Sequence, residues 1–213
     1  KDEKIATGFI ERTDDSLGRQ YWLYVPDNYD ANVSHGLIVW FHPVGQGGKD
    51  GAKMARAFRE FCEDHHFIMM GPKANSVEGW QPSETELVMN DVRKVLGQYT
   101  FDRGRVAAHG MGNGGQMAFY VCFHARDVFR GIATIGAVLG TAPKDNVANQ
   151  PVSFFISVGD KDPTLKDVEA SKQALEEKRF PVVYRKMTES GKEYFDVKTF
   201  TDMLNWLDSL DRM

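Results

Sequence analysis

The fold is decided by the stretch Arg105-Val-Ala-Ala-His-Gly110-Met-Gly112-Asn-Gly114-Gly115-Gln-Met-Ala118. Its first half is short and apolar, which is typical of a buried strand, and its end opens an apolar helix. The glycines between them permit a left-handed backbone and allow strand and helix to approach closely. The stretch therefore predicts a strand, a tight glycine turn and a helix in direct succession.

Short apolar runs and amphipathic helices alternate along the rest of the chain. Strands without polar alternation are expected when helices cover both faces of a parallel sheet. Two further segments, Gly8–Thr13 and Gln20–Val25, flank a polar turn and predict an opening antiparallel hairpin. Together they predict one α/β domain over residues 1–213, with a doubly wound, mostly parallel, eight-stranded sheet. The apolar runs are Leu37–Phe41, Phe67–Met70, Val106–Ala108, Gly131–Ile135, Phe154–Val158 and Val182–Lys186.

The helices are predicted from apolar residues that recur with the helical period, as in Met54, Ala55, Phe58, Phe61 and Cys62. Two more such stripes are Leu87, Val88, Val92, Val95 and Leu96, and Phe200, Met203, Leu204, Leu207 and Leu210. Three helix starts are also predicted from capping chemistry. They are a capping box of Ser83 and Glu86, an N-cap at Thr199, and Asp162 ahead of a helix from Leu165 to Lys178.

Composition excludes some classes of partner. The 213 residues carry a net charge of −4 and a pI near 5.9, so no nucleic-acid binding is expected. No apolar run approaches the about 18 residues that a membrane span needs. Because the sequence starts at Lys1, we expect a processed chain or a piece excised from a longer protein. Cys62 and Cys122 fall in predicted helices and are expected to be buried free thiols.

The turn at Gly110-x-Gly112-x-Gly114 has the shape of a nucleophile elbow, G-x-S-x-G. Over nearly its whole length the chain resembles the α/β-hydrolases of the polyhydroxybutyrate depolymerase, feruloyl esterase and dienelactone hydrolase group. This resemblance implies a sheet of the α/β-hydrolase type, action on ester-linked substrates and a secreted or periplasmic setting. The residues that carry it lie in Leu37–Gly45, Gly79-Trp80, Tyr99–Val106, Gly110–Gly115 and Ser157–Pro163.

The departures from that family concern its catalytic triad. Gly112 stands at the place of the serine, and Asp162 stands at the place of the acid. The histidine is expected near Lys192 or Glu193, yet the last histidine of the chain is His124. Since the nucleophile and the base are both missing, we expect no ordinary serine-hydrolase activity. The chain is predicted to be a non-catalytic, hydrolase-like domain that binds a ligand or a protein partner.

Parts of a binding site are nevertheless expected. The resemblance places an oxyanion hole at the backbone amides of Val44 and Asn113, although His42 is followed by Pro43 where the family has glycine. Glycine-rich backbone at a helix start favours a small anion, so the predicted ligand is anionic or an ester. The predicted ligand-binding residues are His42, Val44, Trp80, His109, Gly112 and Asn113.

Two other functions stay open. One is a divergent ester hydrolase that activates water through His42 or His109, and the other is a scaffold with a vestigial pocket. Gly110, Gly112 and Gly115 also match a dinucleotide fingerprint, but no acidic residue follows at the required distance, so no cofactor is expected. His42, His109 and Asp162 lack the spacing of a metal site, and no metal is expected.

Overall fold

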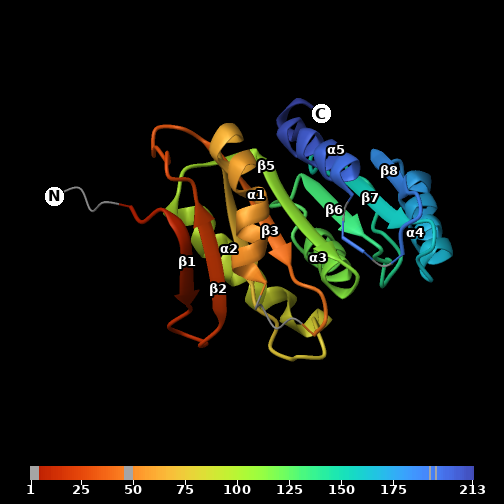
Figure 1. Ribbon diagram of the computed structural model, residues 1–213, viewed down its shortest axis with the longest axis horizontal. Helices are drawn as coiled ribbons and strands as arrows, with labels where there is room; N and C mark the ends of the chain where they lie inside the picture. The colour runs from red at the N-terminus through yellow and green to blue at the C-terminus, as the bar shows by residue number, and fades with distance from the viewer. Residues whose placement is uncertain (1–4, 46–49, 192, 195) are drawn as a thin grey trace.

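The computed structural model describes residues 5–45, 50–191, 193–194 and 196–213. Its centre is one eight-stranded sheet in the order β1-β2-β4-β3-β5-β6-β7-β8 (Figure 1). The β1–β2 and β2–β4 pairs are antiparallel and the remaining pairs are parallel, which confirms the predicted sheet and its opening hairpin. The strands are β1 (Gly8–Thr13), β2 (Gln20–Val25), β3 (His35–Phe41), β4 (Phe67–Pro72), β5 (Phe101–Met111), β6 (Gly131–Ile135), β7 (Ser153–Gly159) and β8 (Val182–Met187).

The main difference in the strands is the length of β5. The sequence predicts only Val106–Ala108, because the residues from Phe101 to Arg105 include four charged or glycine positions, and in the structure they are half-buried or exposed. That segment is strand because Phe101 pairs with His35 of β3 ahead of a register shift. A partner strand, rather than an apolar pattern, therefore fixes the first half of β5.

Helices cover both faces of the sheet. On one face lie α1 (Gly51–His65) and α5 (Val197–Asp208), whose buried residues form one core cluster with Trp22, Trp40 and Phe155. On the other face lie α2 (Thr85–Gln98), α3 (Asn113–His124) and α4 (Leu165–Glu177), which pack on a larger cluster. Two short 3-10 helices, η1 (Pro82–Glu84) and η2 (Leu210–Arg212), precede α2 and follow α5. Both cysteines are buried and free, as predicted.

The predicted capping box at Ser83 and Glu86 is wrong. The box lies two residues earlier, at Gln81 and Glu84, where the Gln81 backbone N–H donates to Glu84 Oε2 at 2.9 Å. Pro82 explains the shift, because proline is favoured in the first turn of a helix and starts η1 ahead of α2.

The predicted cap at Thr199 is also wrong. Asp196 caps α5, and its Oδ1 accepts a hydrogen bond from the Thr199 backbone N–H at 2.7 Å. Thr199 lies three residues into the sequence after that cap and is the recipient of capping. Both residue types can cap, so the choice depends on where the chain leaves the sheet.

Candidate functional site

The glycine turn after β5 keeps the shape of an elbow. Gly112 has φ 54° and ψ −120°, its N–H donates to Ile135 O at 2.9 Å, and its carbonyl accepts from Gln116 N at 2.9 Å. Residues with a side chain rarely adopt a positive φ of this kind. Glycine therefore holds the turn with little strain.

Strand and helix approach each other closely around this turn. A Cβ added at Gly114 would lie 2.1 Å from the Phe41 carbonyl oxygen at the end of β3. The start of α3 thus lies directly against the backbone of β3, and only glycine leaves room for it. The side chains that follow are held at the carboxyl edge of the sheet, where ligands of open α/β sheets bind.

Asp162 lies at the carboxyl end of β7 and is 6% exposed. Its Oδ1 accepts hydrogen bonds from the Thr164 N–H at 2.8 Å and from the Thr164 hydroxyl at 2.7 Å. Thr164 precedes α4, so Asp162 closes the turn before the helix and does not cap the helix amides directly, which corrects the expected role. The Asp162 carboxylate therefore stabilises the turn that precedes α4.

The position of the family's histidine falls in the loop after β8. Lys192 lies outside the described residues, and Glu193 is exposed. In the described part of the chain, no hydrogen bond or ion pair joins Glu193 to Asp162. Tyr194, the next residue, instead turns inward and reaches the sheet.

His109 and Tyr194 form a buried hydrogen-bonded pair. The His109 Nδ1 lies 2.9 Å from Ala133 O, and Nε2 contacts the Tyr194 hydroxyl. Because a carbonyl oxygen can only accept, Nδ1 carries the proton and Nε2 accepts from the tyrosine. Burial lowers the pKa of His109 to about 4, so the ring is neutral near pH 7. Both ring nitrogens are used within the protein, which makes His109 a poor base for activating water.

His42 is held in a similar way. Its Nδ1 lies 2.9 Å from Pro43 O, and its Nε2 accepts from the Ala74 backbone N–H at 3.0 Å. Accepting at Nε2 fixes the proton on Nδ1, and burial lowers the pKa of His42. The ring therefore fastens the loop after β3 to the loop after β4. Its geometry gives no support to water activation at His42.

Asn113 clamps the loop that carries Trp80. The Asn113 Oδ1 accepts from Trp80 N at 2.6 Å, and Nδ2 donates to Trp80 O at 3.2 Å. The Trp80 indole N–H donates to His42 O at 2.9 Å, and the ring packs against Phe41. Trp80 is only 3% exposed, so its ring packs inside the protein next to the end of β3.

The two backbone amides predicted for an oxyanion hole are those of Val44 and Asn113. Val44 follows β3 and is 51% exposed, and Asn113 starts α3. Among the described residues, neither backbone N–H donates a hydrogen bond to the protein. Both are available in principle to an acceptor on a ligand.

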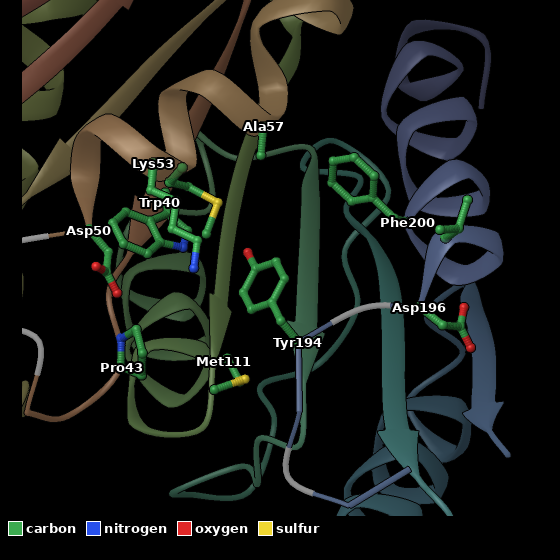
Figure 2. A pocket seen from close by; sticks show the side chains of 11 residues that line it. Trp40, Pro43, Asp50, Lys53, Ala57, Met111, Tyr194, Asp196 and Phe200 are labelled. Carbon is green, nitrogen blue, oxygen red and sulfur yellow. The ribbon is translucent and has the colours of Figure 1, made fainter. Parts of the chain in front are cut away.

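A pocket of about 470 Å³ lies beside the elbow, between α1 and α5 (Figure 2). We call it the α1–α5 pocket. In the view of Figure 2 the Tyr194 ring lies between Trp40 and Phe200. Its walls are aromatic, thioether or aliphatic, and three charged residues lie among its lining residues. The pocket is lined by Trp40, Pro43, Asp50, Lys53, Met54, Ala57, Met111, Tyr194, Asp196, Val197 and Phe200.

None of the six predicted ligand-binding residues lines this pocket, although Pro43 and Met111 adjoin three of them in the sequence. One residue of the predicted apolar stripe of α1 does line the pocket. Met54 is half-exposed there because it faces the cavity. Tyr194 had no comparable signal, because its position depends on the course of the loop after β8. The six predicted ligand-binding residues therefore stay a prediction, and the pocket lies at the same edge of the sheet with other residues as its walls.

Comparison with known proteins supports the fold. Neither the family models nor the curated proteins gave a match. Among solved structures, a ferulic acid esterase superposes with a TM-score of 0.72 at 16% identity, covering 96% of this chain and 96% of that chain. The chain has the α/β-hydrolase fold. Similar structures include a ferulic acid esterase from Anaeromyces mucronatus, solved with ferulic acid (TM-score 0.71, 13% identity, 99% and 93% covered), and an S-formylglutathione hydrolase from Staphylococcus aureus (0.68, 11%, 95% and 98%).

Two further findings apply to the α/β-hydrolase-fold chain. Across the described ranges, no cluster of three or more histidine, cysteine or acidic side chains has the arrangement of a metal site. None of the helices in those ranges combines the length and apolar character required to cross a bilayer.

Proposed function

We propose that this α/β-hydrolase-fold chain binds a small, mainly apolar ligand in the α1–α5 pocket and does not cleave it by serine-triad chemistry. The observation that carries the proposal is the pocket itself, which is about 470 Å³ and lies at the carboxyl edge beside Gly112. Pockets of this size and lining are typical of small-molecule sites. A protein partner stays a prediction of the sequence alone.

The chemistry of the lining favours a ligand with an apolar body and a polar end. Trp40, Met54 and Phe200 offer polarisable contact surface. Lys53 is exposed at the rim and can attract a carboxylate or an ester carbonyl. The backbone amides of Val44 and Asn113 do not line the pocket, but they follow Pro43 and Gly112 in the chain and offer donors to a ligand that extends beyond it. These features support the anionic or ester ligand that the glycine turn predicts.

The absence of a triad supports binding without turnover. Position 112 has no side chain that can attack a carbonyl, and Asp162 is committed to Thr164. His109 and His42, the two candidate bases, each use both ring nitrogens inside the protein. A weak nucleophile without an adjacent base gives little covalent catalysis.

A divergent ester hydrolase is the second candidate. Its support is that the solved structures of the same fold include ferulic acid esterases and S-formylglutathione hydrolases. At 11–16% identity these structures argue for the fold, and the activity has to be tested.

The test is ligand binding in a matched pair of variants. Ala57→Trp fills the α1–α5 pocket from an exposed position on α1, and Ala170→Trp makes the same change on the exposed face of α4. Benzoate, hexanoate, methyl benzoate and ethyl butyrate are titrated in a thermal-unfolding assay. At 100 times its Kd, a ligand stabilises the native state by about 2.7 kcal/mol.

We expect at least one of these compounds to raise the Tm of the wild type and of Ala170→Trp, and to leave the Tm of Ala57→Trp unchanged. Equal shifts in all three proteins would place binding elsewhere and contradict the proposal. No shift with any compound would favour a vestigial pocket.

A further inference from the structure

A pair of buried carboxyl groups lies far along the sequence from the elbow, beneath the β1–β2 turn. Asp14 belongs to that turn and Asp91 to α2. Their side chains are 2% and 1% exposed, respectively. Two carboxylates removed from water in this way need compensating donors or a proton.

Their partners differ sharply. Asp14 accepts from the Ser16 backbone N–H and hydroxyl, both at 2.6 Å, and from Lys94 Nζ. Neither oxygen of Asp91 accepts a hydrogen bond from any described donor. Its nearest cation is Arg19, whose Nε lies 3.4 Å from Asp91 Oδ2 without making a well-aligned hydrogen bond.

The two carboxyl groups contact each other. Two ionised carboxylates repel, so such a contact is attractive only when one proton lies between them. Asp14 has three donors that stabilise its charge, which leaves the proton on Asp91.

We propose that Asp91 is protonated and donates a hydrogen bond to ionised Asp14, that this shared proton fastens the β1–β2 turn to α2, and that its release to solvent as the pH rises loosens the attachment. Burial and then the neighbouring Asp14 raise the pKa of Asp91 to about 6. Lys94 and Ser16 hold the pKa of Asp14 well below its usual range. The pH range of the device therefore includes neutrality.

Two cations lie near the pair. Arg19 and Lys94 favour ionised Asp91, but Lys94 is 50% exposed and bonds Asp14, and Arg19 is shared with Glu84 at 3.6 Å. Burial and Asp14 oppose them and dominate. The groups that face Asp91 are Asp14 and Arg19 from the hairpin, Tyr21 from β2 and Lys94 from α2.

Hydrogen bonds from Arg19 connect this carboxyl pair to the loop after β4, which contacts His42. Arg19 donates to Asn75 Oδ1 at 2.9 Å and to Lys73 O at 3.4 Å. Between these residues, the Ala74 N–H donates to His42 Nε2. A change at Asp91 that moves Arg19 therefore acts on the loop that holds His42.

The sign of the pH effect follows from linkage. A folded-state pKa above the unfolded value of 3.8 adds stability that is complete below pH 3.8 and is lost as the pH rises through about 6. Between pH 5 and pH 8 this changes the unfolding equilibrium constant about tenfold.

Asp91→Asn tests the proposal because asparagine donates a hydrogen bond to Asp14 at every pH. Asp15→Asn is the control, with the same change at an exposed position of the same turn. Urea unfolding is measured at pH 5 and pH 8. Burial lowers the pKa of His35, His42 and His109, which gives the opposite slope in all three proteins, so the variants are compared with wild type at each pH.

We expect Asp91→Asn to match wild type at pH 5 within about threefold in the unfolding constant and to be about tenfold more stable at pH 8. Asp15→Asn should follow wild type at both values. An Asp91→Asn protein that is destabilised equally at both pH values would show that Asp91 is ionised and paired with Arg19, which overturns the proposal.

Two measurements do not depend on the unfolding of the variant. Carboxyl ¹³C NMR of the wild type should show Asp91 titrating with a midpoint close to pH 6, and a midpoint below pH 4 would contradict a shared proton. Hydrogen exchange at Ala74, corrected for intrinsic rates, should lose protection between pH 5.5 and 7.5 in wild type and not in Asp91→Asn.

Discussion

Gly112 combines a positive φ with a position directly before α3. A serine at this position could act as a nucleophile, but its backbone would be strained by on the order of 1–3 kcal/mol. Glycine at this position forms the turn without that strain. Stability at this residue therefore favours glycine, while catalysis would favour serine.

Gly112→Ser should lower the free energy of unfolding by about 1–3 kcal/mol and should give no ester hydrolysis above the buffer rate, because no base can take the hydroxyl proton. Gly97→Ser, at an exposed glycine of α2 with open space around it, is the matched control and should change stability by less than about 1 kcal/mol. Urea unfolding and p-nitrophenyl acetate cleavage measure both effects. A large gain in cleavage from Gly112→Ser alone would reveal an unrecognised base.

Tyr194→Phe removes the hydroxyl that donates to His109 Nε2, so the hydrogen bond between these two side chains is lost. The expected loss of stability is about 1–3 kcal/mol. Tyr184→Phe is the control, since its hydroxyl bonds Glu169 at 2.9 Å and that carboxylate is 39% exposed. Water can replace the lost partner there, so the control should lose less than about 1 kcal/mol. Equal losses in the two variants would mean that the His109 contact is not important for stability.

At the scale of elements, the sequence predicted the hairpin and the parallel strands well, because buried runs such as Gly131–Ile135 have no polar alternation. The sequence did not predict secondary structure that depends on residues outside the segment itself. Phe101 is strand because His35 is beside it, and α2 begins late because Pro82 starts a separate turn. The elbow was predictable since Gly114 must lie against the carbonyl of Phe41.

Gly114→Ala tests that contact between α3 and β3. An added Cβ would lie 2.1 Å from Phe41 O, so helix or strand must shift, and the free energy of unfolding should fall by more than about 2 kcal/mol. Gly97→Ala adds the same methyl group where nothing lies within 4 Å and should be neutral or stabilising by up to about 1 kcal/mol. If Gly114→Ala were as stable as Gly97→Ala, the close approach of α3 and β3 would be wrong.

Asp196→Ala tests the start of α5. It removes the acceptor of the Thr199 N–H and should cost about 0.5–2 kcal/mol in thermal or urea unfolding. Thr199→Ser keeps that N–H and should cost much less. The reverse order of the two effects would restore Thr199 as the cap.

At the scale of the whole molecule, the α/β-hydrolase fold brings residues 40, 54, 111, 194 and 200 to one edge of the sheet, where they enclose the α1–α5 pocket. Residue types and the family resemblance place a binding site at this edge, and the triad positions that the resemblance assigns stay a prediction. They did not predict the pocket. Its walls come from β3, β5, α1, α5 and the loops beside them, and their spacing depends on the packing of α1 and α5 on the sheet.

The main proposal is that the α1–α5 pocket binds its ligand and does not cleave it. It is tested most directly by incubating the protein with ethyl butyrate or methyl benzoate, whichever raises the Tm, and measuring the ester that remains by mass spectrometry. We expect the ester to disappear no faster than in buffer alone, both with the wild type and with Ala57→Trp. Faster loss of ester with wild type and with Ala170→Trp, abolished in Ala57→Trp, would show a hydrolase and contradict it.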